Sequence, residues 1–148
     1  LTALGNVSTA LLYRELTKPE IKERSLAALE MVGLGERHDH RPIEMSGGEQ
    51  QRVAIARALV TDPLMILADE PTGALDTKTA TIVMEIFKNL QSENRAIVLV
   101  THDLEIAEQM DRVVSMRDGK IVADDLRSER TDALEDRFWE AGKGGKLE

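Results

Sequence analysis

Hydrophobic positions along the chain recur with the period of an amphipathic helix in three places. The first predicted helix, Pro19–Val32, has a capping box at Thr17 and Glu20, and Gly33 ends it. The second runs from about Met45 to Val60, and the third spans about Lys78–Ser92. In the third helix, the residues expected to face inward are Ile82, Ile86, Phe87 and Leu90.

Uninterrupted apolar runs of strand length lie between and after these helices. Leu64–Asp69 and Ala96–Val100 predict strands that are covered on both faces of a parallel sheet. A short helix over Asp103–Met110 is followed by two strands, Arg112–Met116 and Arg117–Asp124, with an Asp-Gly turn. The alternation of strands and helices predicts an α/β fold. Leu126–Gly142, which contains the only tryptophan, is expected to form a terminal helix.

Composition narrows the possible functions. The 148 residues carry 27 acidic and 19 basic side chains, a formal net charge of −8, which argues against a general nucleic-acid binder. The absence of cysteine excludes disulfides and thiolate metal sites. Apolar runs such as Ala96–Val100 are far shorter than the roughly 20 residues that a membrane-spanning helix needs. We therefore expect a soluble chain of about one domain.

A serine and two glycines stand at the start of the second predicted helix. In "MSGGEQQRVAIARAL", Ser46 and Glu49 have the spacing of a capping box. Gly47 and Gly48 are poor helix formers, yet they leave the backbone N–H groups accessible at the positive end of the helix dipole. These features predict an anion site at this helix tip, with phosphate as the expected ligand.

Two adjacent carboxylates follow the first predicted strand. Asp69 and Glu70 stand where open α/β sheets bind their ligands, at the carboxyl end of a strand. Neighbouring side chains on extended backbone point in different directions, so one acid can hold Mg²⁺ directly or through water while the other orients or deprotonates an attacking water. His102 follows the second strand in "VTHD" and is expected at the same edge, within reach of a terminal phosphate.

The remaining two histidines are close together in the sequence and could suggest a metal site. His38 and His40 in "RHDH" lack further ligands at metal-site spacing, and we interpret them as a solvated turn.

Four stretches of the sequence, in this order, resemble motifs of the ATP-binding cassette ATPases, the nucleotide-binding subunits of ABC transporters. "MSGGEQQRVAIARAL" resembles the family signature, with Met45 for the commoner Leu and Glu49 for the commoner Gln. "MILADE" resembles Walker B with the catalytic Glu, "GALD" the D-loop and "VTHD" the switch-histidine loop. The wording "ILADEPTGALD" is most similar to the lipoprotein-release and macrolide-export branch.

The resemblance implies a role for each motif residue in ATP hydrolysis. Asp69 would bind Mg²⁺ through water, Glu70 would be the general base, and His102 would sense the γ-phosphate. Asp76 would couple the two sites of a dimer. The residues that would contact ATP held by the opposing subunit are Ser46, Gly47 and Gly48. Glu49 is expected to turn back and cap its helix, because a carboxylate facing the phosphate would repel it.

The resemblance covers Leu1 to about Asp125 and lacks the family's N-terminal motifs. No G-x-x-x-x-G-K-[ST] loop, the Walker A motif, is present, nor is a Q-loop glutamine before Leu1. The expected fold is the C-terminal part of a P-loop NTPase (RecA-like) parallel-sheet core with the α-helical subdomain. The expected boundaries are 1–62 for the helical subdomain, 63–125 for the partial core and 126–148 for a C-terminal helix and tail. This piece alone is predicted to be inactive.

By the same resemblance, the parent would bind ATP and Mg²⁺ and work as a dimer. It would be cytoplasmic, held at the inner face of the membrane by transmembrane permease subunits, with no nucleic-acid partner. Two alternatives stay open. One is the ATPase head of a DNA-repair or chromosome-maintenance protein, against which the acidic charge and the short region before Met45 argue. The other is a non-catalytic assembly fragment that docks through its helical subdomain.

Overall fold

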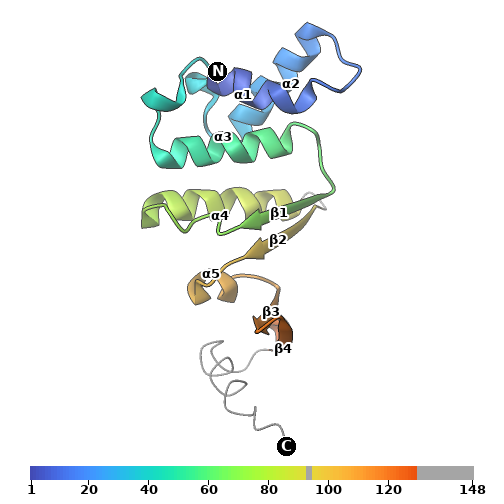
Figure 1. Ribbon diagram of the computed structural model, residues 1–148, viewed down its shortest axis with the longest axis vertical. Coiled ribbons are helices and arrows are strands. Elements are labelled where there is room, and N and C mark those ends of the chain that lie inside the picture. Colours follow the sequence, from blue (N-terminus) through green and yellow to red (C-terminus); the bar gives the residue numbers. More distant parts are fainter. Residues whose placement is uncertain (93–94, 130–148) are drawn as a thin grey trace, which may run out of the picture. The chain divides into compact units, whose positions relative to one another are not determined.

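The computed structural model describes residues 1–92 and 95–129 of the chain (Figure 1). Contacts within the chain divide it into two units, Leu1–Val100 and Thr101–Glu148. Of the predicted terminal helix Leu126–Gly142, only the beginning is described, and there Arg127–Glu129 form a single 3₁₀ turn. In the described part of the chain, every helix is too short or too polar to cross a membrane.

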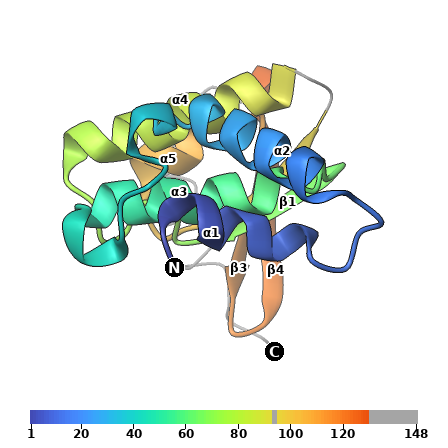
Figure 2. The same ribbon diagram turned by 90° about the horizontal axis from the view of Figure 1, so that it is seen from above.

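The first half of the first unit is a cluster of helices. Figure 2 shows α1, α2 and α3 packed side by side, and each of the three contacts the other two. The elements of this cluster are α1 (Ala3–Ser8), η1 (Thr9–Leu11), α2 (Lys18–Met31), η2 (Gly35–Arg37), η3 (Pro42–Glu44) and α3 (Gly47–Leu59). Its fully buried side chains include Val7, Leu11, Leu29, Val32 and Leu34.

Helix α2 begins and ends where local chemistry predicts. The Thr17 N–H donates to the carboxylate of Glu20 at 2.8 Å, which closes the capping box. Gly33 has a φ of 71°, and the Leu34 N–H returns to the Leu29 carbonyl at 2.8 Å. The spacing of residues along this helix puts Ile21, Ser25, Ala28, Leu29 and Val32 on one face. The last four are buried and Ile21 is half-buried, so this face is largely confirmed.

The histidine loop has a structural role that its sequence does not reveal. The Ala3 N–H donates to the His40 carbonyl and the Leu4 N–H to the His38 carbonyl, both at 2.8 Å. These are N–H groups of the first turn of α1, which have no partner within their own helix. The loop therefore caps α1 and fastens it to the segment that leads into the signature stretch.

Strands β1 (Met65–Asp69) and β2 (Ala96–Val100) are parallel, in register from Met65 opposite Ala96 to Asp69 opposite Val100. Helix α4 (Thr77–Ser92) joins them and packs against β2 (Figure 1). The expectation that both faces of these strands are covered is wrong for the described residues. Leu67 is 71% exposed and its cross-strand partner Val98 43%, so this face of the two strands is largely uncovered.

Helix α4 carries a clear apolar stripe. Its buried residues are Val83, Met84, Ile86, Phe87 and Leu90. Ile82 was expected to face inward, but it is 36% exposed. The stripe runs along positions 83, 86, 87 and 90, with the spacing of one helical face, and Ile82 lies at its edge.

The second unit begins with a short helix and continues as a hairpin. Its described elements are α5 (Leu104–Glu108), β3 (Arg112–Arg117) and β4 (Lys120–Leu126). The predicted Asp-Gly turn is confirmed, with φ of 50° at Asp118 and 75° at Gly119. The two strands are antiparallel. A salt bridge joins them, with Nη2 of Arg112 2.6 Å from Oδ2 of Asp124. Together with the parallel pair β1–β2, these elements confirm the α/β class.

Candidate functional site

The start of α3 presents an exposed, amide-lined tip. Ser46 is the N-cap residue, and its hydroxyl oxygen accepts from the Glu49 N–H at 3.2 Å. The Glu49 carboxylate in turn accepts from the Ser46 N–H at 2.8 Å. The expectation that Glu49 turns back to cap its helix is confirmed. Ser46 and Gly47 are exposed, so the hydroxyl proton of Ser46 and the Gly47 N–H remain accessible to a ligand.

The second glycine of this tip lies in different surroundings. Gly48 is buried, and a Cβ added there would overlap the methyl carbon of Thr79 on α4, whereas a Cβ added at Gly47 would meet nothing within 4 Å. Thr79 also donates to Asp76, from its hydroxyl at 2.7 Å and from its N–H at 3.1 Å. Through Thr79, the structure brings the tip of α3 together with Asp76.

A further bond connects α3 to the loop after β1. The side-chain amide of Gln51 donates to the Pro71 carbonyl at 3.2 Å, one residue beyond Glu70. Sequence reasoning missed both Gln51 and Thr79. The Asp-x-x-Thr spacing of Asp76 and Thr79 was a signal for a helix cap, but nothing in the sequence pairs Gln51 with a carbonyl 20 positions away.

The two carboxylates lie at the carboxyl end of β1. Asp69 is the last residue of the strand and is exposed. Glu70 has a φ of 46°, and its N–H donates to the Val100 carbonyl at 2.8 Å, so β2 holds the backbone at this bend. A left-handed conformation is uncommon for a residue other than glycine, and it turns the Glu70 side chain away from the direction of strand alternation.

His102 lies two residues beyond the end of β2, in the second unit, and it is exposed. The parallel register places the ends of β1 and β2 opposite each other, Asp69 against Val100, as the sequence predicted. The approach of His102 to a phosphate held near Glu70 stays a prediction. The other two histidines make local contacts, His38 with the Gly35 carbonyl at 2.8 Å and His40 with the Asp39 carboxylate at 3.0 Å.

Hydrogen bonds favour the charged form of two acids near this site. The Thr79 hydroxyl, and then the Thr79 N–H, hold the pKa of Asp76 below its ordinary value. The Ser46 N–H is the main cause of the lowered pKa of Glu49, with smaller contributions from Arg37 and Arg52. Both acids are therefore ionised at neutral pH.

The donors present fit a magnesium ion held jointly with a nucleotide. Within 1–92 and 95–129, no three His, Asp or Glu side chains gather into a metal cage. Mg²⁺ is commonly bound by one or two carboxylates, water and substrate phosphates, and the exposed carboxylate of Asp69 can supply such a ligand. These residues are suited to a magnesium ion that is bound together with nucleotide phosphates, and less suited to an ion held by protein side chains alone.

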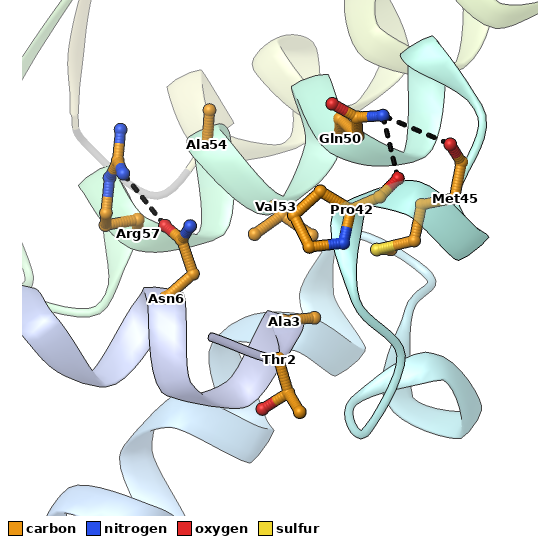
Figure 3. A pocket seen from close by; sticks show the side chains of 9 residues that line it. All are labelled: Thr2, Ala3, Asn6, Pro42, Met45, Gln50, Val53, Ala54 and Arg57. Carbon is orange, nitrogen blue, oxygen red and sulfur yellow. Dashed lines mark hydrogen bonds between the residues drawn. The ribbon is translucent and has the colours of Figure 1, made fainter.

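Helix α3 lines hollows in the described part of the first unit. One of about 210 Å³ lies between α1 and α3 (Figure 3), where Arg57 donates to the Asn6 side chain at 2.8 Å and Gln50 donates to the Pro42 and Met45 carbonyls. It contains none of the predicted site residues. Another, of about 160 Å³, lies between α3 and β1, and Asp69 is part of its lining.

Comparison with known proteins agrees with these motifs. The sequence model of a family described as ABC transporter matches residues 2–73. YknY, an uncharacterized ABC transporter ATP-binding protein of Bacillus subtilis, is 53% identical over 122 residues, which are 82% of this chain and 53% of YknY. The macrolide export ATP-binding/permease protein MacB 1/2 of Paracoccus denitrificans is 52% identical over 124 residues, 84% of this chain and 19% of that protein.

Solved structures give the same result for the fold. The dimeric structure of MJ0796, described as a bacterial ABC transporter cassette, matches with a TM-score of 0.76 and 40% identity over 86% of this chain and 57% of that one. Another structure of MJ0796, a post-hydrolysis state bound to ADP and Pi, matches with a TM-score of 0.75. The chain spans about half the length of these cassettes and of relatives such as YknY.

Proposed function

Since this chain belongs to the ABC transporter ATP-binding family, we propose that it is the signature and Walker B part of a nucleotide-binding domain. The whole domain would hydrolyse ATP as a dimer and drive transport through membrane permease subunits, at the cytoplasmic face of the membrane. The observation that carries this proposal is the exposed amide tip of α3, joined through Gly48 and Thr79 to Asp76.

In this proposal, the carboxylates and His102 act on the ATP of their own subunit. Asp69 would hold Mg²⁺ through water, and the ion, when bound, would neutralise charge on the phosphates. Glu70 accepts a proton from the attacking water, a role that a carboxylate can fill as general base. His102 contacts the γ-phosphate from the loop after β2.

The tip of α3 would serve the opposite subunit. Ser46 donates its hydroxyl proton to a γ-phosphate oxygen, and the amides of Gly47 and Gly48 add the positive end of the helix dipole. Because Asp76 is bonded to Thr79, which packs on Gly48, movement at one site is passed to the other. The dimeric cassette structure among the relatives supports this arrangement.

The experiment uses the longest protein that contains this sequence together with a Walker A segment. Glu70→Gln is expected to lower its ATP turnover by about 10²–10⁴-fold, the usual range for a general base, with ATP binding retained. The measurement is phosphate release together with calorimetric ATP binding. The 148-residue chain alone should release no phosphate above background. Turnover in that chain that disappears in its Glu70→Gln variant would contradict the proposal.

A further inference from the structure

Glu49 brings a negative charge to the helix tip that is proposed to receive phosphate. A free carboxylate in the first turn of α3 would repel a polyanion. In the structure, one of its oxygens, Oε2, accepts from the Ser46 N–H at 2.8 Å. That bond engages only Oε2, so a second group can act on the other oxygen, Oε1.

Arg37 supplies this second group from a different element. Its Nε lies 3.3 Å from Oε1 of Glu49, an ion-pair contact without hydrogen-bond geometry, and its Nη2 donates to the Glu44 carbonyl at 3.2 Å. The Glu49 side chain is 20% exposed and the Arg37 side chain 39%, so water screens this pair less than a fully exposed one. Arg52 also attracts the Glu49 carboxylate, but it belongs to the same helix as Glu49. Arg37 belongs to η2, so its ion pair links the cap of α3 to a separate element.

We propose that Arg37 is a positioning residue of the phosphate-binding tip, because it holds Glu49 in the helix cap and compensates its charge. The inference rests on the function proposed above and adds a residue that lies outside every motif of that site. With Oε2 hydrogen-bonded to the Ser46 N–H and Oε1 attracted by the Arg37 guanidinium, the Glu49 side chain is held back from a bound anion. Loss of Arg37 removes the ion pair at Oε1 and leaves the charge beside Ser46 compensated by Arg52 alone among these two arginines.

The positioning role is measured on the chain itself. Arg37→Gln is expected to raise the pKa of the Glu49 carboxyl, read by NMR titration, toward its ordinary value. It should also speed hydrogen exchange of the Ser46 amide by about fivefold, because the capping bond opens more often. Arg24→Gln removes the same charge from the exposed part of α2 and should change neither reading.

The electrostatic role is measured on the longer ATP-hydrolysing protein. Arg37→Gln is expected to raise the KM for ATP about fivefold, a size expected for a partly screened charge next to a polyphosphate. Arg37→Lys, which keeps the charge, should recover most of the loss. The double variant Arg37→Gln/Glu49→Gln should return to within about twofold of Glu49→Gln alone, since no charge then needs compensation.

The double variant separates charge compensation from a purely structural role. If the loss arises from the Arg37–Glu44 bond, the double variant stays as impaired as Arg37→Gln, and the proposal is overturned. An unchanged Glu49 pKa and Ser46 exchange rate in Arg37→Gln overturn it as well, whether or not the protein hydrolyses ATP. Absence of hydrolysis in the wild-type protein would instead contradict the proposed function, and leave the NMR result as a separate measurement of the Arg37–Glu49 pair.

Discussion

Gly47 and Gly48 are adjacent in the sequence but lie in different surroundings in the structure. The first is open to solvent, and the second packs against Thr79. The sequence predicted correctly that Glu49 caps the helix, because a Ser-x-x-Glu spacing depends on local geometry alone. The sequence could not distinguish the two glycines, because the neighbour of Gly48 comes from another helix.

This difference gives a prediction with its own matched control. Gly48→Ala is expected to lower the free energy of unfolding by about 1–3 kcal/mol, as overpacking does, because the added methyl group overlaps Thr79. Gly47→Ala makes the same chemical change in open space and should alter stability by less than about 0.5 kcal/mol. Denaturant unfolding of both variants measures the difference. Equal effects of the two substitutions would contradict the close contact between Gly48 and Thr79.

The capping carboxylate of Glu49 predicts a dependence of stability on pH. Its pKa lies below the ordinary value of 4.5, chiefly because it accepts from the Ser46 N–H. A lowered pKa in the folded state stabilises the fold above the ordinary value, and the stabilisation is lost as the pH falls through the lowered one. Unfolding experiments from about pH 5.5 down to about pH 3.5 should therefore show a shallower fall for Glu49→Gln than for the wild type. Identical slopes would argue against the capping bond.

At the scale of elements, local signals located most boundaries. The predicted helix Pro19–Val32 corresponds to α2, and the Asp-Gly turn joins β3 and β4. Burial was less predictable, as Ile82 shows. Its spacing from Ile86 placed it on the apolar face of α4, but the buried face is centred on Val83 and Phe87, and Ile82 lies at its edge. The extent of a buried face depends on what lies against it.

The end of α2 provides a test at this scale. Gly33 has a φ of 71°, and a Cβ there would meet nothing within 4 Å. Gly33→Ala should therefore cost about 1 kcal/mol of stability through backbone conformation alone. Thermal unfolding is the measurement, and Gly47→Ala, at a position without a positive φ, is the control. A neutral Gly33→Ala would mean that α2 ends in another way.

At the scale of the whole molecule, the parallel pair β1–β2 has one covered and one uncovered face. Ile66 is 7% exposed, whereas its neighbour Leu67 is 71% exposed. Ile66 and Leu67 were both expected to be buried, because an uninterrupted apolar run predicts a strand covered on both faces. The run itself does not show which face is uncovered in this chain.

The two neighbouring residues should respond very differently to truncation. Ile66→Ala is expected to cost about 2–4 kcal/mol in this chain, the usual range for a buried aliphatic side chain. Leu67→Ala should cost less than about 0.5 kcal/mol here, because little apolar surface is lost from an exposed position. In the longer protein of the proposed function, Leu67→Ala should become as costly as Ile66→Ala. Denaturant unfolding of both forms checks this, and an equally costly Leu67→Ala in the short chain would contradict the exposed face.

The sequence by itself determined what depends on neighbours a few residues away: helix periods, the caps at Thr17 and Ser46, the Asp-Gly turn, and the family motifs. Such features form from contacts within one or two turns, so their residue types are visible in any short window. Only the tertiary structure decided that Gly48 packs on Thr79, that Arg37 holds Glu49, and which strand face is covered. These contacts join segments distant in the chain, and their partners are chosen by packing, which local spacing does not encode.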